Sequence, residues 1–249
     1  WSDSDTTLYL NAGGAAARTA RNIGTDDVDE AFIVEQTGGD ASSATIKVTA
    51  FGRSNTYKHV RAISADFLDG DDSVLIKSSV LVPVTIQGGA GDDVVTYEGA
   101  NAGTGTGDSS SVVLRGGAGN DFLSVAGAAN ALLEGGGDND VLIHEGTGTA
   151  TLRGDAGNDL LVGSSKTDVL EGGGDNDQLE GVAAQFLGGG GNDTLYVTID
   201  RLDYPSVTMD GGSGTDTLVL TLGSANDALT VSRQAAGVLT LDLNGAPRT

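Results

Sequence analysis

The chain of 249 residues contains no cysteine, three prolines and one methionine, and aromatic residues make up only 4% of it. Without cysteine, the fold has no disulfide scaffold and no thiol chemistry. Basic residues are also scarce, because 13 Lys and Arg face 35 Asp and Glu, which leaves a net charge of −22. So acidic a chain repels phosphate groups, which argues against nucleic acid and anionic membrane surfaces as partners and is compatible with cations. An acidic surface that only keeps the chain soluble is the alternative.

Long apolar runs and helical periodicity are missing as well. No run approaches the roughly 18 apolar residues of a membrane-spanning helix, so we expect no membrane insertion. The chain starts at Trp1 without an initiator methionine or a basic-then-apolar leader, and we therefore expect it to be a processed or excised piece. The feature that stands out against these absences is glycine, with 40 residues.

Glycine recurs in a six-residue pattern that reads GGxGxD in its clearest form. The final aspartates of successive copies are 18 or 19 residues apart in the middle of the chain, and such a short fixed period predicts a solenoid. Degenerate copies end at Asp72 and Asp227. The seven clear copies are Gly88–Asp93, Gly116–Asp121, Gly135–Asp140, Gly154–Asp159, Gly172–Asp177, Gly188–Asp193 and Gly211–Asp216.

Short β-prone segments such as FLSV and VLIH flank each cluster, with an apolar residue two positions after each final Asp. One repeat therefore predicts a Gly-rich turn, a strand, a plainer turn and a second strand. Stacked repeats form an all-β parallel β-roll or β-solenoid of about 18–19 residues per coil, with a Gly/Asp-rich turn ladder on one edge. Irregular spacing, as at Gly99–Ser111, predicts insertions in the plainer turns.

Three segments are expected along the chain. Residues 1–62 form irregular β-rich coils, residues 63–222 form the β-roll, and residues 223–249 begin a further β-rich unit that resembles the N-terminal part. Thr215–Gly223 is similar to Ser4–Gly13, which suggests that the piece spans about one unit of a longer tandem array. Chance similarity between Thr-rich strands is the alternative explanation.

The final aspartates need a partner when the turns stack. Successive carboxylates would lie about 4.8 Å apart, the spacing of strands, where like charges repel each other. Calcium binds roughly six to eight hard oxygens, including carboxylates and backbone carbonyls, and glycine lets a turn point its carbonyls inward. Each turn thus looks like half of a calcium site. A metal-free ladder of mutually capping Asn and Asp is the alternative, and the fifth-position asparagines are expected to bond within their turns without a metal role. They are Asn120, Asn139, Asn158, Asn176 and Asn192.

These residues resemble the nonapeptide G-G-x-G-x-D-x-U-x of RTX, or haemolysin-type, calcium-binding repeat proteins, where U is a large apolar residue. The resemblance covers roughly Asp66 to Leu220 and implies a right-handed parallel β-roll from a secreted or surface protein of bacteria. It also implies a set of metal-site residues. The aspartates of this set are Asp93, Asp121, Asp140, Asp159, Asp177, Asp193 and Asp216, and the glycines are Gly88, Gly91, Gly116, Gly119, Gly135, Gly137, Gly154, Gly157, Gly172, Gly174, Gly188, Gly191, Gly211 and Gly214.

The chain departs from the family pattern in two respects. Only one half of each coil matches, so we predict a single row of about five to seven calcium ions rather than rows on both edges. Asp155 stands at the second glycine of its turn, and Asp138 and Asp175 stand at the last glycine of theirs, so these turns are either distorted or hold an extra carboxylate near the ion. The turn that ends at Asp72 lacks its first two glycines, which weakens the case for a site there.

No pattern predicts catalysis. His59 and His144 lie in strand-like stretches with no Ser, Cys or acidic partner at a recognisable catalytic spacing, and we expect them to be surface or strand histidines. The Gly-rich turns lack the lysine and the following helix of a phosphate-binding loop. Charged residues that precede the glycines are predicted to form exposed ladders between coils. They are Arg115, Glu134, Arg153 and Glu171.

We therefore expect a non-enzymatic, calcium-binding structural module of an extracellular bacterial protein, such as a surface layer, adhesin or filament. Calcium ions fold and rigidify it, and neighbouring copies in a surface assembly are its expected protein partners. One alternative is a calcium-dependent folding and secretion module attached to a secreted enzyme or toxin. Another is an adhesin surface that binds carbohydrate or a protein partner.

Overall fold

The computed structural model describes residues 7–10, 29–99, 111–127, 130–199, 207–222, 229–233 and 239–243. All regular structure within these ranges is β-strand, as the missing helical periodicity predicted. No helix in the described part is therefore long and apolar enough to cross a membrane. Most of the insertion at Gly99–Ser111 lies outside these ranges, as do parts of the segments compared for a tandem array, and the array stays a prediction.

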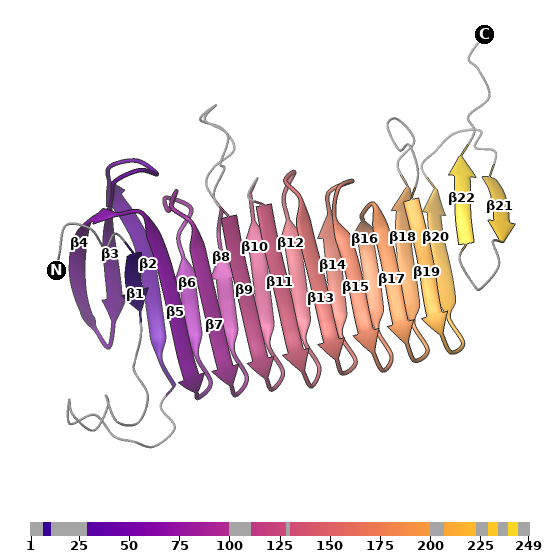
Figure 1. Ribbon diagram of the computed structural model, residues 1–249, viewed down its shortest axis with the longest axis horizontal. Helices are drawn as coiled ribbons and strands as arrows, with labels where there is room; N and C mark the ends of the chain where they lie inside the picture. Colours follow the sequence, from indigo (N-terminus) through magenta and orange to yellow (C-terminus); the bar gives the residue numbers. More distant parts are fainter. Residues whose placement is uncertain are drawn as a thin grey trace, which may run out of the picture.

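Two sheets of eleven strands run along the length of the molecule (Figure 1). Sheet A contains, in spatial order, β1 (Thr7–Leu10), β5 (Ala62–Asp69), β7 (Val84–Ala90), β9 (Ser111–Ala118), β11 (Asn130–Gly137), β13 (Ala150–Ala156), β15 (Val169–Gly174), β17 (Gln185–Gly190), β19 (Val207–Ser213), β22 (Leu239–Leu243) and β21 (Leu229–Arg233). Sheet B contains β20 (Thr217–Leu222), β18 (Thr194–Ile199), β16 (Gln178–Val182), β14 (Leu160–Ser164), β12 (Val141–Glu145), β10 (Phe122–Ala126), β8 (Val94–Tyr97), β6 (Ser73–Ile76), β2 (Ala31–Gly38), β3 (Ala44–Ala50) and β4 (Arg53–Val60).

Each coil of the solenoid uses one strand from each sheet. The chain leaves sheet A through a GGxGxD turn, enters sheet B, and returns through a plainer turn. Strands pair in parallel with the equivalent strand of the next coil, so that Leu123 lies beside Leu142 and Leu142 lies beside Leu161. All seven Gly-rich turns stand on one edge, the lower edge in Figure 1. The predicted β-solenoid with its single turn ladder is therefore confirmed.

A narrow apolar core fills the space between the two sheets. The residue two positions before the first glycine is buried in each of the seven coils, and the residue two positions after the final Asp is buried in all but the last. Burial of each such side chain contributes about 1.5–3 kcal/mol. The first set is Ile86, Leu114, Leu133, Leu152, Leu170, Phe186 and Met209, and the second is Val95, Leu123, Leu142, Leu161, Leu179 and Leu195.

Antiparallel strands interrupt the parallel stacking at both ends. At the N-terminal end, β2 pairs in parallel with β6 but antiparallel with β3, and β3 pairs with β4. At the C-terminal end, β22 pairs antiparallel with both β19 and β21. The uniform coils that carry the Gly-rich turns therefore lie between two irregular ends.

Candidate metal centre

The final aspartates of the Gly-rich turns form a buried row along one edge of the solenoid. Six of them expose only 1–2% of their surface, although carboxylates are among the groups least often buried. Asp216 is exposed, because it ends the row in the last coil. The six buried residues are Asp93, Asp121, Asp140, Asp159, Asp177 and Asp193.

One oxygen of each carboxylate is bound to the preceding coil. The backbone N–H of Asp121 donates to Oδ1 of Asp140 at 2.8 Å, and the N–H of Asp140 donates to Oδ1 of Asp159 at 2.8 Å. The same bond joins every coil from Asp72 to Asp216, with N···O distances of 2.8–3.1 Å. The carboxylates therefore do not simply face each other as the sequence analysis supposed, because a backbone amide stands between each pair.

The second oxygen, Oδ2, of all six buried aspartates has no hydrogen-bond partner. It lies beside the first glycine of its own turn, where it occupies the space that a Cβ would fill. At Gly154 that space is shared by Oδ2 of Asp159 and by the carbonyl oxygen of Gly172, 2.5 Å from the Cβ position. A buried polar atom without a partner costs about 1–3 kcal/mol, and more when charged, so this oxygen calls for a cation or a proton.

Burial makes these carboxyl groups reluctant to ionise. The loss of hydration raises the pKa of Asp140 to about 8, and the negative charges of Asp121, Asp159 and Asp138 add to the effect. The hydrogen bond from the amide of Asp121 opposes it. Burial is also the first cause in the other coils, where the pKa rises to about 7 for Asp93 and Asp177 and to about 6 for Asp121 and Asp159, and rises for Asp193.

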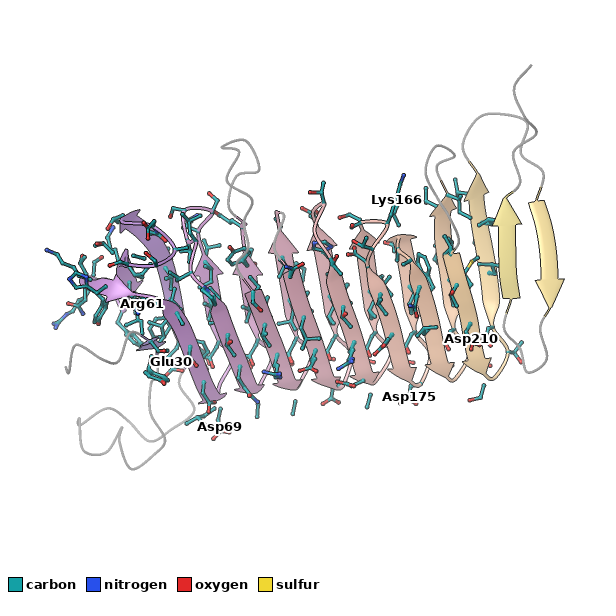
Figure 2. The ribbon with its side chains drawn as sticks, turned by 45° about the horizontal axis from the view of Figure 1, so that its top comes forward. Glu30, Arg61, Asp69, Lys166, Asp175 and Asp210 are labelled. Atoms are coloured by element: carbon teal, nitrogen blue, oxygen red, sulfur yellow. The ribbon has the colours of Figure 1, made fainter. Side chains whose placement is uncertain are left out.

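Positive φ angles recur at the second and fourth positions of the turns. Asp155 has φ 73° at a second position, where Gly117 has φ 131°, and Asp138 and Asp175 have φ 72° at fourth positions. Asp155 still pairs in register with the equivalent glycines of both neighbouring coils, so the distortion that was one expectation for its turn is not found. The three carboxylates are exposed, and Asp175 lies at the turn edge, as Figure 2 shows.

The turn at Asp72 differs in the space beside its first position. Phe67 stands there in place of glycine, is fully buried, and packs against Phe32 with ring centroids 5.2 Å apart. Leu68 adopts the positive φ of the second glycine, at 77°. Oδ1 of Asp72 accepts the N–H of Glu30 at 2.7 Å. This turn therefore keeps the hydrogen-bond ladder but not the open space that the glycines leave.

The fifth-position asparagines form a second ladder on the turn surface. The N–H and Nδ2 of Asn158 both donate to Oδ1 of Asn139, at 2.9 and 3.0 Å, and Asn176 bonds to Asn158 in the same way. The expectation of bonds within each turn was wrong, because stacking brings the side-chain oxygen of the preceding coil next to each amide. The two ladders line a groove of ≈ 420 Å³ across four coils.

The predicted charge ladder is confirmed on the outer face of sheet A. Glu134 accepts from Arg115 Nε at 2.5 Å and from Arg153 Nη1 at 3.3 Å. Arg153 Nε also donates to Glu171 at 2.7 Å. Partly exposed ion pairs such as these contribute about 0–1 kcal/mol each, so they stabilise the stack less than the buried ladder does.

The two histidines differ in environment. His59 is exposed on β4, with Nδ1 3.2 Å from Ser43 Oγ, as expected of a surface histidine. His144 is fully buried in β12, and its Nδ1 lies 2.8 Å from Oδ2 of Asp168, so the surface alternative was wrong for it. The alternation in VLIH, which places His144 on the same inward face as Leu142, was the signal that could have shown this.

Asp168 is a site residue that the sequence analysis missed, because the plainer turns have no aspartate at a fixed position. It is fully buried, and its carboxylate also accepts the N–H groups of Ser165 and Ala150, both at 2.9 Å. These hydrogen bonds connect Asp168 to the backbone of its own turn and to the preceding coil.

The donor set of the turns fits calcium. Among the described residues, no three acidic or histidine side chains gather as a metal cluster. A cation at the turns must therefore take backbone carbonyl oxygens together with the unpartnered Oδ2 atoms, and calcium accepts such a mixture of hard oxygens.

Comparison with known protein families finds the RTX calcium-binding nonapeptide repeat four times, at residues 84–102, 99–132, 153–182 and 185–198. These matches contain the turns that end at Asp93, Asp121, Asp159, Asp177 and Asp193. The resemblance noted from the sequence is thus confirmed. No curated protein and no solved structure matches the chain.

Proposed function

Because residues 84–198 carry RTX calcium-binding nonapeptide repeats, we propose that the chain is a structural module of an extracellular bacterial protein that calcium folds and rigidifies. Its setting would be a surface layer, an adhesin or a filament. The observation that carries this proposal is the row of six buried aspartates, each with an Oδ2 that no hydrogen bond satisfies. A stiff rod suits a protein that must extend from a cell.

The proposed ligands follow from that row. Each ion takes a carboxylate oxygen and backbone carbonyl oxygens from two adjacent Gly-rich turns. The aspartates concerned are those of the seven clear turns, from Asp93 to Asp216, and the first glycine of each turn leaves the space beside Oδ2. Seven turns in one row enclose six gaps. One ion in each gap gives six ions, a number within the five to seven expected from the sequence.

The electrostatics explain why calcium controls folding. With a net charge of −22, the unfolded chain repels itself and stays expanded. Folding buries carboxylates whose raised pKa values oppose ionisation at neutral pH. Calcium that binds the folded chain supplies the missing stabilisation through linkage. The chain would be unfolded where calcium is scarce, inside the cell, and folded outside, which aids export.

A calcium titration followed by far-UV circular dichroism tests the proposal, with magnesium as the control cation. We expect a cooperative change from coil to β-structure with calcium alone, and the number of ions bound should be about six. A β-spectrum in chelator from a sample shown by metal analysis to hold no calcium would overturn the proposal, because the metal-free ladder would then suffice.

A further inference from the structure

Each end of sheet B finishes in a strand with one unpaired edge. Among the described strands, β20 at the C-terminal end pairs only with β18, and β4 at the N-terminal end pairs only with β3 (Figure 1). Both end strands run in the same direction as the interior of the sheet, because β3 is antiparallel to β2 and β4 is antiparallel to β3. A free strand edge readily pairs with a strand of another chain. The two edges can therefore join in the parallel arrangement of the interior strands.

The apolar core is open at the β20 edge. Leu218 and Leu220 pack against the core but remain half-buried, whereas Leu195, the register partner of Leu218 on β18, exposes only 3% of its surface. The backbone N–H of Thr217 donates to the carbonyl oxygen of Asp193 on the β18 side. Since successive amides of a strand point to opposite sides, the N–H groups of Leu218 and Leu220 point to the free edge. A further strand would bind these amides and bury both leucines.

The two ends of sheet B carry opposite charges. Residues 44–61, which include β3 and β4, contain four basic residues and no acidic one, whereas residues 207–222, which include β19 and β20, contain two acidic residues and no basic one. Figure 2 shows Arg61 and Asp210 toward the opposite ends of the rod. Arg53 is exposed on β4, and no ion pair among the described residues includes it. A basic end on so acidic a chain attracts the acidic end of a second copy.

We propose that copies of this chain join end to end, with β20 of one copy paired in parallel with β4 of the next. The proposal deepens the filament setting proposed above and rests on the calcium-folded module. Both strands start at the edge of the Gly-rich turns, so one register sets Arg53 beside the exposed Asp216. In the same register Tyr57 lies beside Leu220. Tyr57 is on the inward face, because it pairs with the buried Ile46, and it therefore covers the open core.

A two-fold pairing of β20 with β20 fits the molecule less well. It would bring two acidic ends together and set the edge strands antiparallel. The end-to-end contact brings opposite charges together, and because it does not close on itself, each further copy lengthens the rod. An end face of about 20 Å by 20 Å buries roughly 800 Å² for the pair. That total is below the roughly 1,200 Å² of stable complexes, so free copies associate weakly and the contact is best trapped covalently.

The test uses single cysteines, because the chain has none of its own. Val219→Cys on β20 and Thr56→Cys on β4 lie side by side in the proposed register, within the Cα separation of about 4.4–6.8 Å that a disulfide spans. The matched control is Val94→Cys, since Val94 is exposed at 43% on β8, inside sheet B, and Val219 at 40%. Pairs of variants are mixed in saturating calcium, with one partner labelled with ¹⁵N. Mass spectrometry identifies the disulfide-linked species, and circular dichroism is recorded for each sample.

The mixture of Val219→Cys and Thr56→Cys should form its disulfide at least about tenfold faster than the mixture of Val94→Cys and Thr56→Cys. Arg53→Glu, added to Thr56→Cys, should slow this reaction, whereas Lys166→Glu makes the same charge change in a plainer turn and should not.

Equal rates for the two mixtures would overturn the proposal. So would a Val219→Cys variant that links to itself faster than to Thr56→Cys, because that result indicates the two-fold contact. Absence of a β-spectrum in calcium would instead overturn the proposed function, so the two failures are distinguishable.

Discussion

Asp177→Asn should change the stability of the chain in opposite directions with and without calcium. Oδ1 of Asp177 accepts the N–H of Asp159 at 2.9 Å, and an asparagine keeps that acceptor. Its amide nitrogen would replace the unpartnered Oδ2, beside the carbonyl oxygen of Gly188, which lies 2.5 Å from the Cβ position of Gly172. The substitution therefore removes a charge that the metal-free fold cannot satisfy, and with it a proposed calcium ligand.

The magnitude follows from the pKa of Asp177, which burial raises from 3.8 to about 7. At pH 8 the folded chain must ionise this carboxyl against a shift of about three pKa units, which corresponds to about 4 kcal/mol. This is an upper value, and we expect about 2–4 kcal/mol of stabilisation in chelator. For a chain of this length that raises the Tm by about 5–15 °C.

Thermal unfolding measures both effects, in saturating calcium and in chelator with an osmolyte such as sucrose, which favours burial and folds the metal-free chain. The control is Asp175→Asn, which removes an equal charge two residues earlier from an exposed position with φ 72° that asparagine also tolerates. We expect the Asp177→Asn variant to melt above the wild type in chelator, to melt below it in calcium, and to bind fewer ions. An Asp177→Asn variant that melts below the wild type in chelator would show that the charge of Asp177 does not destabilise the metal-free fold.

Other measurements test the rest of the structure. In chelator with the same osmolyte, the wild type should gain stability as pH falls from about 8 to about 4, because the folded chain binds protons that the unfolded chain has released; a flat profile would contradict the raised pKa values. Asp168→Ala should lower the free energy of unfolding, measured in urea, by about 3–5 kcal/mol, because it leaves buried amides without an acceptor. His144→Val should lower it by less than half as much. Asn158→Ala should cost about 1–2 kcal/mol by the same assay, through bonds lost on both sides of its coil. Asp155→Gly should stabilise by about 0.5–1 kcal/mol by relief of a positive φ, and a fall in calcium affinity would instead place its carboxylate at an ion.

Much of the fold was predictable because its pattern is local and repeated. Each copy of GGxGxD marks a turn, and the apolar residues at fixed distances from it mark the inward face, as Leu123 and Leu142 show. Repetition strengthens each weak sequence pattern, because the strand register that buries the apolar residues of one coil also buries those of the next. The same alternation places His144 on the inward face of its strand, which favours the strand alternative given for that residue over the surface one.

The site was predictable as a set of residues but not as an arrangement of atoms. The sequence placed the final aspartates in one row. It did not show that Oδ1 of each accepts a hydrogen bond from the backbone amide of the preceding coil, while Oδ2 has no partner. The prediction that Asn158 bonds within its turn was wrong, because Asn139 comes next to its amide only when the coils stack.

The sequence by itself determined the period, the turn edge and the inward residues, because these depend on neighbours within one coil. The tertiary structure alone decided which residues of different coils touch. His144 and Asp168 are 24 residues apart and share no repeated spacing, so only the stacked coils bring them together. The same stacking aligns Phe122, Val141 and Leu160 on sheet B, since a row across strands exists only after each coil has found its register on the next.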